Sequence, residues 1–347
     1  MAMITYAQAR SAFLGAARLA DATLNEYPNP ERGPEGEALA IDVACLGDPN
    51  TAQKLVLISG VHGVEGYAGS MIPTDLIGRL LPSEGLEIVL IHAVNPHGMA
   101  WFRRVTEEGV DLNRNFVDFD QPLPANPAFD EQLAKWLTPS AAQKSTADAA
   151  LMRWMKSDMP TMRAAVAGGQ YRFPAAPFFG GFAPTWARAN FETILAKHVG
   201  AARTVCIIAF HTGLGDGGIG QFIGSHTARA KEREIERFIW GEEYVESGEA
   251  GTISYIISGD LPDGVRRQLS GASVIAVAHE FGTLPEMSVL EALRIDHAAA
   301  VAKARDFACM KSIYDAFFVC DERWKTTVIK QAREGVERAL TWFERQP

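Results

Sequence analysis

Six short runs of almost uninterrupted apolar residues alternate along the chain with longer segments of helical periodicity. The apolar runs cover 38–47, 54–61, 86–94, 203–212, 219–225 and 273–282. Continuous apolar strands are typical of a sheet that is buried on both faces. Helical periodicity lies near 6–24, 68–81, 129–137, 146–157, 186–198, 227–240, 286–317 and 322–344. The alternation predicts a three-layer α/β/α sandwich with a mixed, largely parallel central sheet.

The length of 347 residues is compatible with one large α/β domain or with two domains. No linker separates two folded parts, so we predict a single domain over 1–347. The section 117–200 is less regular and is interpreted as insertion-like. Within it, 168–184 is rich in glycine, proline and aromatic residues. Such a segment is either a surface loop packed by its own aromatic side chains or the wall or lid of a pocket.

Composition excludes several classes of protein. A formal net charge of −9 argues against nucleic-acid binding as the main function. No apolar run approaches the ~20 residues that span a bilayer, so no membrane association is expected. The first residues lack the pattern of a signal peptide. Cys45, Cys206, Cys309 and Cys320 form no C-x-x-C motif and are expected to be reduced, buried thiols. These features favour a cytoplasmic protein.

Polar residues follow the apolar runs at the positions where ligands bind in open α/β sheets, beyond the carboxyl ends of the strands. His62 and Glu65 follow one run with H-x-x-E spacing, and His211 lies at the end of another. Zinc takes imidazole nitrogen and carboxylate oxygen ligands, and a catalytic zinc keeps three protein ligands and one open position. His62, Glu65 and His211 are therefore candidate ligands of one zinc ion per chain.

Glu280 lies at the end of a nearly continuous apolar strand, where an unpaired carboxylate is energetically costly. Strand alternation sends His279 and Glu280 to opposite faces, so only one of them can face a shared cleft. We assign Glu280 as the general base or acid and His279 as a structural residue.

The segment 103–116 contains three arginines and two asparagines within fourteen residues. Guanidinium groups bind carboxylates through two parallel hydrogen bonds, and asparagine adds an amide donor. Taken alone, this segment is more simply interpreted as a surface loop whose arginines are solvated.

Five motifs in order resemble those of the zinc metallocarboxypeptidase family, the carboxypeptidase A/B-like enzymes, and within it a bacterial branch. They are H-G-V-E-G at 62–66, N-P-H-G at 95–98, R-V-T-E-E-G-V-D-L-N-R-N-F at 104–116, F-H-T-G at 210–213 and H-E-F-G-T at 279–283. The resemblance implies the fold of those enzymes and a zinc site on His62, Glu65 and His211. It also implies that Glu280 is the catalytic glutamate.

The same resemblance implies roles for further residues. Arg104 would polarise the scissile carbonyl, Asn113 and Arg114 would hold the free carboxylate of the substrate, and Asp111 would orient His62. Tyr255, 25 residues before Glu280, is a candidate for the tyrosine that the family carries near this position. His97 stands where the family often has aspartate.

The resemblance implies hydrolysis of an amide bond next to a free carboxylate, by a metallocarboxypeptidase acting on short peptides. Aspartoacylase-like and succinylglutamate-desuccinylase-like deacylases share the ligand pattern, so an N-acyl amino acid remains an alternative substrate. A binding protein without turnover is less favoured, because it has no need for a base beside the metal. A dinucleotide loop at 213–218 is disfavoured because a strand follows it, and a serine hydrolase because G-x-S-x-G is missing.

Overall fold

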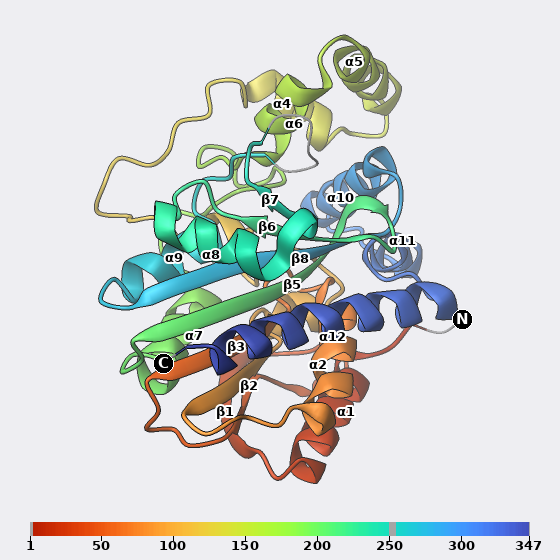
Figure 1. The fold of residues 1–347 in the computed structure, drawn as a ribbon. Coiled ribbons are helices and arrows are strands. Elements are labelled where there is room, and N and C mark those ends of the chain that lie inside the picture. The colour runs from red at the N-terminus through yellow and green to blue at the C-terminus, as the bar shows by residue number, and fades with distance from the viewer. Residues whose placement is uncertain (1–2, 250–254, 347) are drawn as a thin grey trace.

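Eight strands form one mixed sheet within the residues that the computed structural model describes, 3–249 and 255–346 (Figure 1). The strand order is β1-β2-β4-β3-β5-β8-β6-β7. The strands are β1 (Thr23–Arg32), β2 (Ala38–Leu46), β3 (Gln53–Ser59), β4 (Leu86–His92), β5 (Thr204–Gly217), β6 (Gly220–Gly224), β7 (Tyr244–Glu246) and β8 (Ser273–Gly282). The central strands β4, β3, β5 and β8 are parallel, whereas β1, β2 and β6 join the sheet by antiparallel pairing. The sheet is mixed, as predicted.

Helices cover both faces of the sheet. They are α1 (Tyr6–Leu19), α2 (Gly66–Leu76), α3 (Pro96–Ala100), α4 (Glu131–Leu137), α5 (Lys144–Ser157), α6 (Met159–Ala167), α7 (Trp186–His198), α8 (Ala230–Trp240), α9 (Leu261–Gln268), α10 (Glu286–Val301), α11 (Phe307–Phe317) and α12 (Glu322–Glu344). Alternate side chains of β3 reach opposite faces. Leu55 and Leu57 pack in the core with α1, α2, α8 and α12, while Val56 and Ile58 pack in the core with α7 and α9. The three-layer α/β/α prediction is confirmed.

A third, smaller core lies outside the two main layers. It joins α4, α5 and α6 to α10 and α11 through Phe129, Leu133, Met162, Leu290 and Phe317. Figure 1 shows α4, α5 and α6 gathered together, far from the β1 edge of the sheet. Most of the irregular section 117–200 therefore packs on the C-terminal helices.

Several element boundaries differ from the sequence predictions. The predicted helix over 6–24 ends at Leu19, because Asp21 adopts a left-handed φ of 55° and the chain turns into β1. The predicted helix over 286–317 divides into α10 and α11, since Lys303 has a φ of 52° and Asp306 caps a new helix at the Cys309 N–H. The strand predicted to end at 212 continues to Gly217.

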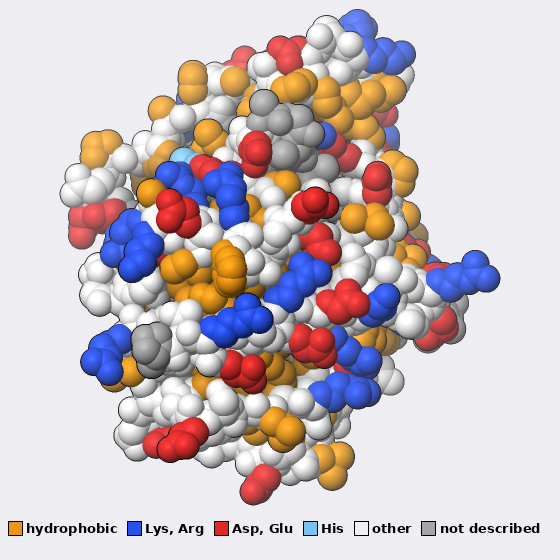
Figure 2. All heavy atoms as spheres, viewed as in Figure 1, with side chains coloured by type: hydrophobic (Ala, Val, Ile, Leu, Met, Phe, Trp, Pro, Cys, Tyr) orange, Lys and Arg blue, Asp and Glu red, His pale blue; other side chains and the backbone are white. Residues whose placement is uncertain are grey.

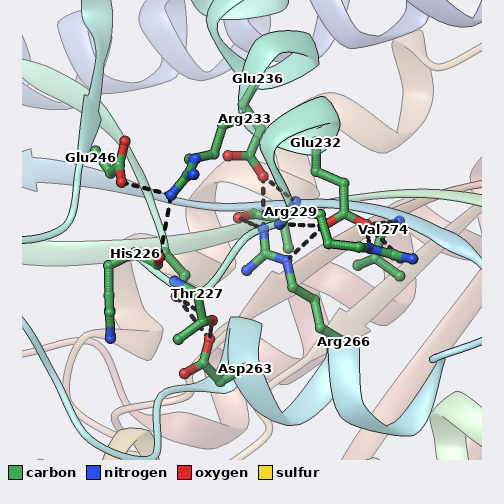
Figure 3. Close-up of polar contacts among 12 residues, drawn as sticks. His226, Thr227, Arg229, Glu232, Arg233, Glu236, Glu246, Asp263, Arg266 and Val274 are labelled. Carbon is green, nitrogen blue, oxygen red and sulfur yellow. Dashed lines mark hydrogen bonds and ion pairs between the residues drawn. The ribbon is translucent and has the colours of Figure 1, made fainter.

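Buried and half-buried ion pairs fix α9 to its neighbours (Figure 3). Arg266 donates to Glu236 of α8 at 2.8 Å, and Glu232 of α8 accepts the N–H of Val274 in β8 at 3.1 Å. At the first turn of α9, Asp263 accepts a 2.7 Å hydrogen bond from Ser225, which follows β6. The Ser225 contact thus holds the first turn of α9 beside the end of β6, and the Arg266 contact holds its last turn against α8.

The four cysteines are unpaired; Cys45, Cys206 and Cys309 are buried and Cys320 is half-buried. Among residues 3–249 and 255–346, no helix combines the length and apolarity needed to cross a membrane. On the face shown in Figure 2, basic and acidic side chains are interspersed around small apolar patches.

Candidate active site

Four polar residues lie at one edge of the sheet, near the carboxyl ends of β3, β5 and β8. They are His62, Glu65, His211 and Glu280. Ser59 of β3 pairs with Phe210 of β5, and His211 pairs with Glu280 of β8. The chain after β3 makes a tight turn at Gly63, where an added Cβ would lie 2.1 Å from the backbone of Gly98. Only glycine fits there, and the turn places the residues on either side of it beside the end of β5.

His62, Glu65 and His211 form a buried cluster whose ligand atoms all lie within 4.8 Å of one another. Nδ1 of His211 lies 3.0 Å from Oε2 of Glu65. Nδ1 of His62 lies 2.8 Å from Oε1 of Glu65 without forming a hydrogen bond, so a buried ring nitrogen faces a carboxylate with no satisfied partner. Two imidazoles and one carboxylate match the three protein ligands of a catalytic zinc site, and a bound cation would satisfy the orphaned nitrogen. This cluster can bind a metal ion.

Asp111 and Arg104 hold the side chains of the cluster in place through hydrogen bonds. Asp111 accepts from Nε2 of His62 at 3.0 Å and from Nε of Arg104 at 2.9 Å, and it turns Nδ1 of His62 toward Glu65. Arg104 also donates to Oε1 of Glu65 at 2.8 Å. Burial would raise the pKa of Asp111 and of Glu65, but the charges and hydrogen bonds of Arg104 and the histidines hold both pKa values below the ordinary range. Both carboxylates are therefore ionised.

Glu280 faces the same cavity and has a different electrostatic environment. Burial, together with the charge of Glu65, raises the pKa of Glu280 to about 7. Oε1 of Glu280 accepts the N–H of Leu214 at 3.1 Å. The neighbouring His279 points to the opposite face, as strand alternation predicts, and stacks on Phe222 with 3.8 Å between ring centroids. A carboxyl group with a pKa near neutrality can both accept and return a proton.

Asn113 and Arg114 lie on the short 3₁₀ turn η2 (Leu112–Arg114) and line the cavity. Oδ1 of Asn113 accepts the N–H of Leu261 at 2.8 Å, which leaves its amide N–H groups as donors. Arg114 is fully buried and donates to the carbonyl oxygen of Ala167 from Nε at 3.1 Å and from Nη2 at 2.6 Å. The end of α6 thus fixes this guanidinium at the cavity wall.

The cavity has a volume of about 150 Å³. Its polar lining includes His62, Glu65, Arg104, Asn113, Arg114, His211, Glu280 and Tyr255. Its apolar lining comes largely from α6 and α10 and includes Met159, Met162, Val166, Met287, Leu290 and Leu293. At the edge of the cavity, Arg163 of α6 and Glu286 of α10 form a two-point ion pair with distances of 2.8 Å and 2.6 Å.

The structure brings together all the residues that the sequence singled out for the site, whereas His97 lies on α3 beside Trp101. Phe178, Arg163 and Asp260 also line the cavity and were not predicted from the sequence. The aromatic composition of 168–184 is the signal that points to Phe178. Nothing in the spacing of Arg163 or Asp260 indicates a pocket.

The fold and the site together define an α/β/α protein with a candidate metal centre. The chain belongs to the family described as "Protein of unknown function (DUF2817)", whose model matches residues 3–331. A comparison with curated protein sequences finds no match.

Solved structures with a similar arrangement include a carboxypeptidase A and an aspartoacylase family protein. Carboxypeptidase A from Helicoverpa armigera is 10% identical, with 98% of this chain and 74% of that chain covered and a TM-score of 0.49. Bovine thrombin-activatable fibrinolysis inhibitor is 12% identical, with 97% and 98% covered and a TM-score of 0.47. An aspartoacylase family protein from Mesorhizobium loti is 14% identical, with 80% and 66% covered and a TM-score of 0.40. At such distances, function has to be argued from the site itself.

Proposed function

We propose that this chain is a zinc-dependent hydrolase that cleaves an amide bond next to a free carboxylate, as a carboxypeptidase acting on short peptides. The observation that carries the proposal is the buried cluster of His62, Glu65 and His211 in one cavity with Glu280 and Arg114. In this proposal, residues 1–347 form a single catalytic domain, and the section 117–200 contributes a wall of the substrate pocket.

His62, Glu65 and His211 would hold the zinc ion. When bound, zinc acidifies water and polarises a carbonyl group. Glu280 takes the proton of the attacking water and passes it to the leaving nitrogen, a task suited to a carboxyl group whose pKa is raised to about 7. Arg104 stabilises the negative charge that develops on the carbonyl oxygen. The reaction needs no serine or cysteine nucleophile.

Asn113 and Arg114 would bind the free carboxylate of the substrate. The carbonyl oxygens of Ala167 and Asn113 engage three of the five N–H groups of Arg114, so two remain for a ligand. The free amide donors of Asn113 lie on the same turn. Tyr255 lines this cavity and is a further candidate contact.

A deacylase of N-acyl amino acids is the second candidate, and the size of the cavity is compatible with it. A cavity of about 150 Å³ holds a group no larger than about one benzene ring. That space suits an acyl group or one apolar side chain, and it does not require a longer peptide.

Two matched substrate panels test the proposal on the zinc-loaded protein. One panel contains short peptides with free or amidated C-termini, and the other contains N-acyl amino acids. We expect release of the terminal residue from free-acid peptides and little from their amidated counterparts. Turnover of N-acyl amino acids alone would establish the second candidate. Equal rates on free-acid and amidated peptides, or no turnover in either panel, would contradict the proposal.

A further inference from the structure

Phe178 lies on the wall of the cavity with a backbone conformation that is unfavourable for its residue type. Its φ is 60°, in the left-handed region, and its side chain is only 5% exposed. A side chain with Cβ costs free energy in this region relative to glycine, and residues held this way cluster at functional sites. The chain keeps a phenylalanine here although glycine would relieve the backbone, so the ring is the feature to explain.

The ring of Phe178 lies over two guanidinium groups. Cζ of Arg104 is 5.5 Å from the ring centroid, and Cζ of Arg114 is 5.6 Å from it. A cation within about 6 Å of an aromatic face is attracted by the ring quadrupole, most strongly where water is excluded. One side chain therefore contacts both Arg104 and Arg114.

Backbone hydrogen bonds hold Phe178 in this conformation. Its carbonyl oxygen accepts the N–H of Gln170 at 3.1 Å. The next carbonyl oxygen, that of Phe179, accepts the N–H of Asp111 at 2.8 Å, and the carbonyl of Gly180 accepts from the side chain of Asn115 at 2.8 Å. The loop is thus tied to the same segment, 103–116, that carries the two arginines.

We infer that Phe178 is a positioning residue that fixes Arg104 and Arg114 relative to each other, so that one substrate meets both. The inference rests on the proposed function, because Arg104 would act on the scissile carbonyl and Arg114 on the carboxylate. Hydrogen bonds hold each guanidinium on one side, and loss of the ring removes the contact on the other side and exposes the group to water. Both the binding of a carboxylate and the turnover of bound substrate then weaken.

The test compares Phe178→Leu with variants in which Phe178 is replaced by mono-, tri- and pentafluorophenylalanine. Fluorination keeps the shape of the ring and progressively removes its attraction for cations. Phe182→Leu is the matched control, since Phe182 lies on the same loop, is 65% exposed and contacts Phe179. For each variant of the zinc-loaded protein we would measure kcat and KM, the affinity for 3-phenylpropanoate by calorimetry, and Tm.

We expect Phe178→Leu to lower both the affinity for 3-phenylpropanoate and kcat, each by about tenfold. The fluorinated series should decline in steps at constant Tm, and Phe182→Leu should match the wild type. An active wild type with a flat fluorinated series would overturn the inference and leave the proposed function standing. A wild type without turnover would overturn the proposed function, and the carboxylate affinities alone would then decide whether Phe178 acts through Arg114.

Discussion

Glu280 differs from the other carboxylates of the site in its surroundings. Glu65 and Asp111 each pair with Arg104, whereas Glu280 accepts a backbone N–H and has a raised pKa. We predict that Glu280→Gln keeps its metal and its substrate affinity but loses about 10²–10⁴ in kcat, because the proton carrier is gone. Metal analysis and steady-state kinetics check this. Near wild-type kcat, or loss of the metal, would show that Glu280 is a structural or ligating residue.

In the proposed function, Arg114 sets the preference for substrates with a free carboxylate. Removing a charged hydrogen-bond partner costs roughly 1.5–3 kcal/mol, so Arg114→Ala should raise KM for free-acid substrates by about 10- to 150-fold. Turnover of amidated substrates should change little. Arg172→Ala, an exposed arginine of the neighbouring loop, is the control for loss of a positive charge. An unchanged ratio of free-acid to amidated activity in Arg114→Ala would rule out the carboxylate clamp.

At the residue scale, the sequence predicts the groups whose position follows from strand order. His211 and Glu280 pair with each other on neighbouring parallel strands, so their proximity follows from the sheet alone. The place of Phe178 depends on a left-handed φ and on a loop that closes back onto Asp111. No spacing in the sequence encodes that closure. For this reason the contact of the Phe178 ring with Arg104 and Arg114 could not be predicted.

At the element scale, α9 is a helix that the sequence pattern does not predict. Its capping residue, Asp260, also makes the stability of the fold depend on pH. Its sequence L-P-D-G-V-R-R-Q is short and contains proline and glycine, so periodicity does not reveal it. The helix exists because Asp260 caps it, accepting the Asp263 N–H at 3.0 Å, and because Arg266 pairs with Glu236 of α8. The first is a capping contact and the second is a tertiary contact, and a pattern of hydrophobic residues reveals neither of them.

Asp260 makes this helix sensitive to pH. Burial, together with the charge of Asp263, raises the pKa of Asp260 from 3.8 to about 7. Below pH 3.8 both the folded and the unfolded state hold the proton. As the pH rises toward 7, the unfolded state gives up its proton first, so folding stability is lost. Asparagine caps as well as aspartate and does not titrate.

We therefore predict that Asp260→Asn gains stability relative to the wild type as the pH rises from 4 to 8. The measurement is Tm for both proteins across that range. A difference in Tm that stays constant with pH would show that Asp260 is ionised in the folded state.

At the scale of the whole molecule, the apolar runs predict the main layers of the fold. One buried polar side chain, His92, lowers the stability of the fold in acid. His92 is fully buried on β4, stacks on Phe13 and contacts Oγ of Ser70 at 2.8 Å. Burial, with a smaller effect of Arg10, lowers the pKa of His92 to about 3. Asp42 lies 4.0 Å from its other ring nitrogen. This Ser–His–Asp grouping lies within the core rather than at the cavity, so its consequence is for stability.

Below pH 6.5 the unfolded chain protonates His92 and the folded chain does not, so stability falls as the pH drops toward 3. For this one group we predict a loss of about 2 kcal/mol between pH 7 and pH 5. His92→Gln should lack that part of the loss in denaturant titrations at the two pH values. Equal losses in both proteins would mean that His92 is protonated in the folded state.

The metal content of the purified, zinc-equilibrated protein tests the proposed zinc site most directly. We predict about one zinc ion per chain for the wild type and almost none for His211→Ala, which removes one of three ligands. His226→Ala, which removes a histidine beside α8 and outside the cluster, should retain the wild-type content (Figure 3). Full zinc content in His211→Ala, or a wild type that binds no zinc, would contradict the account.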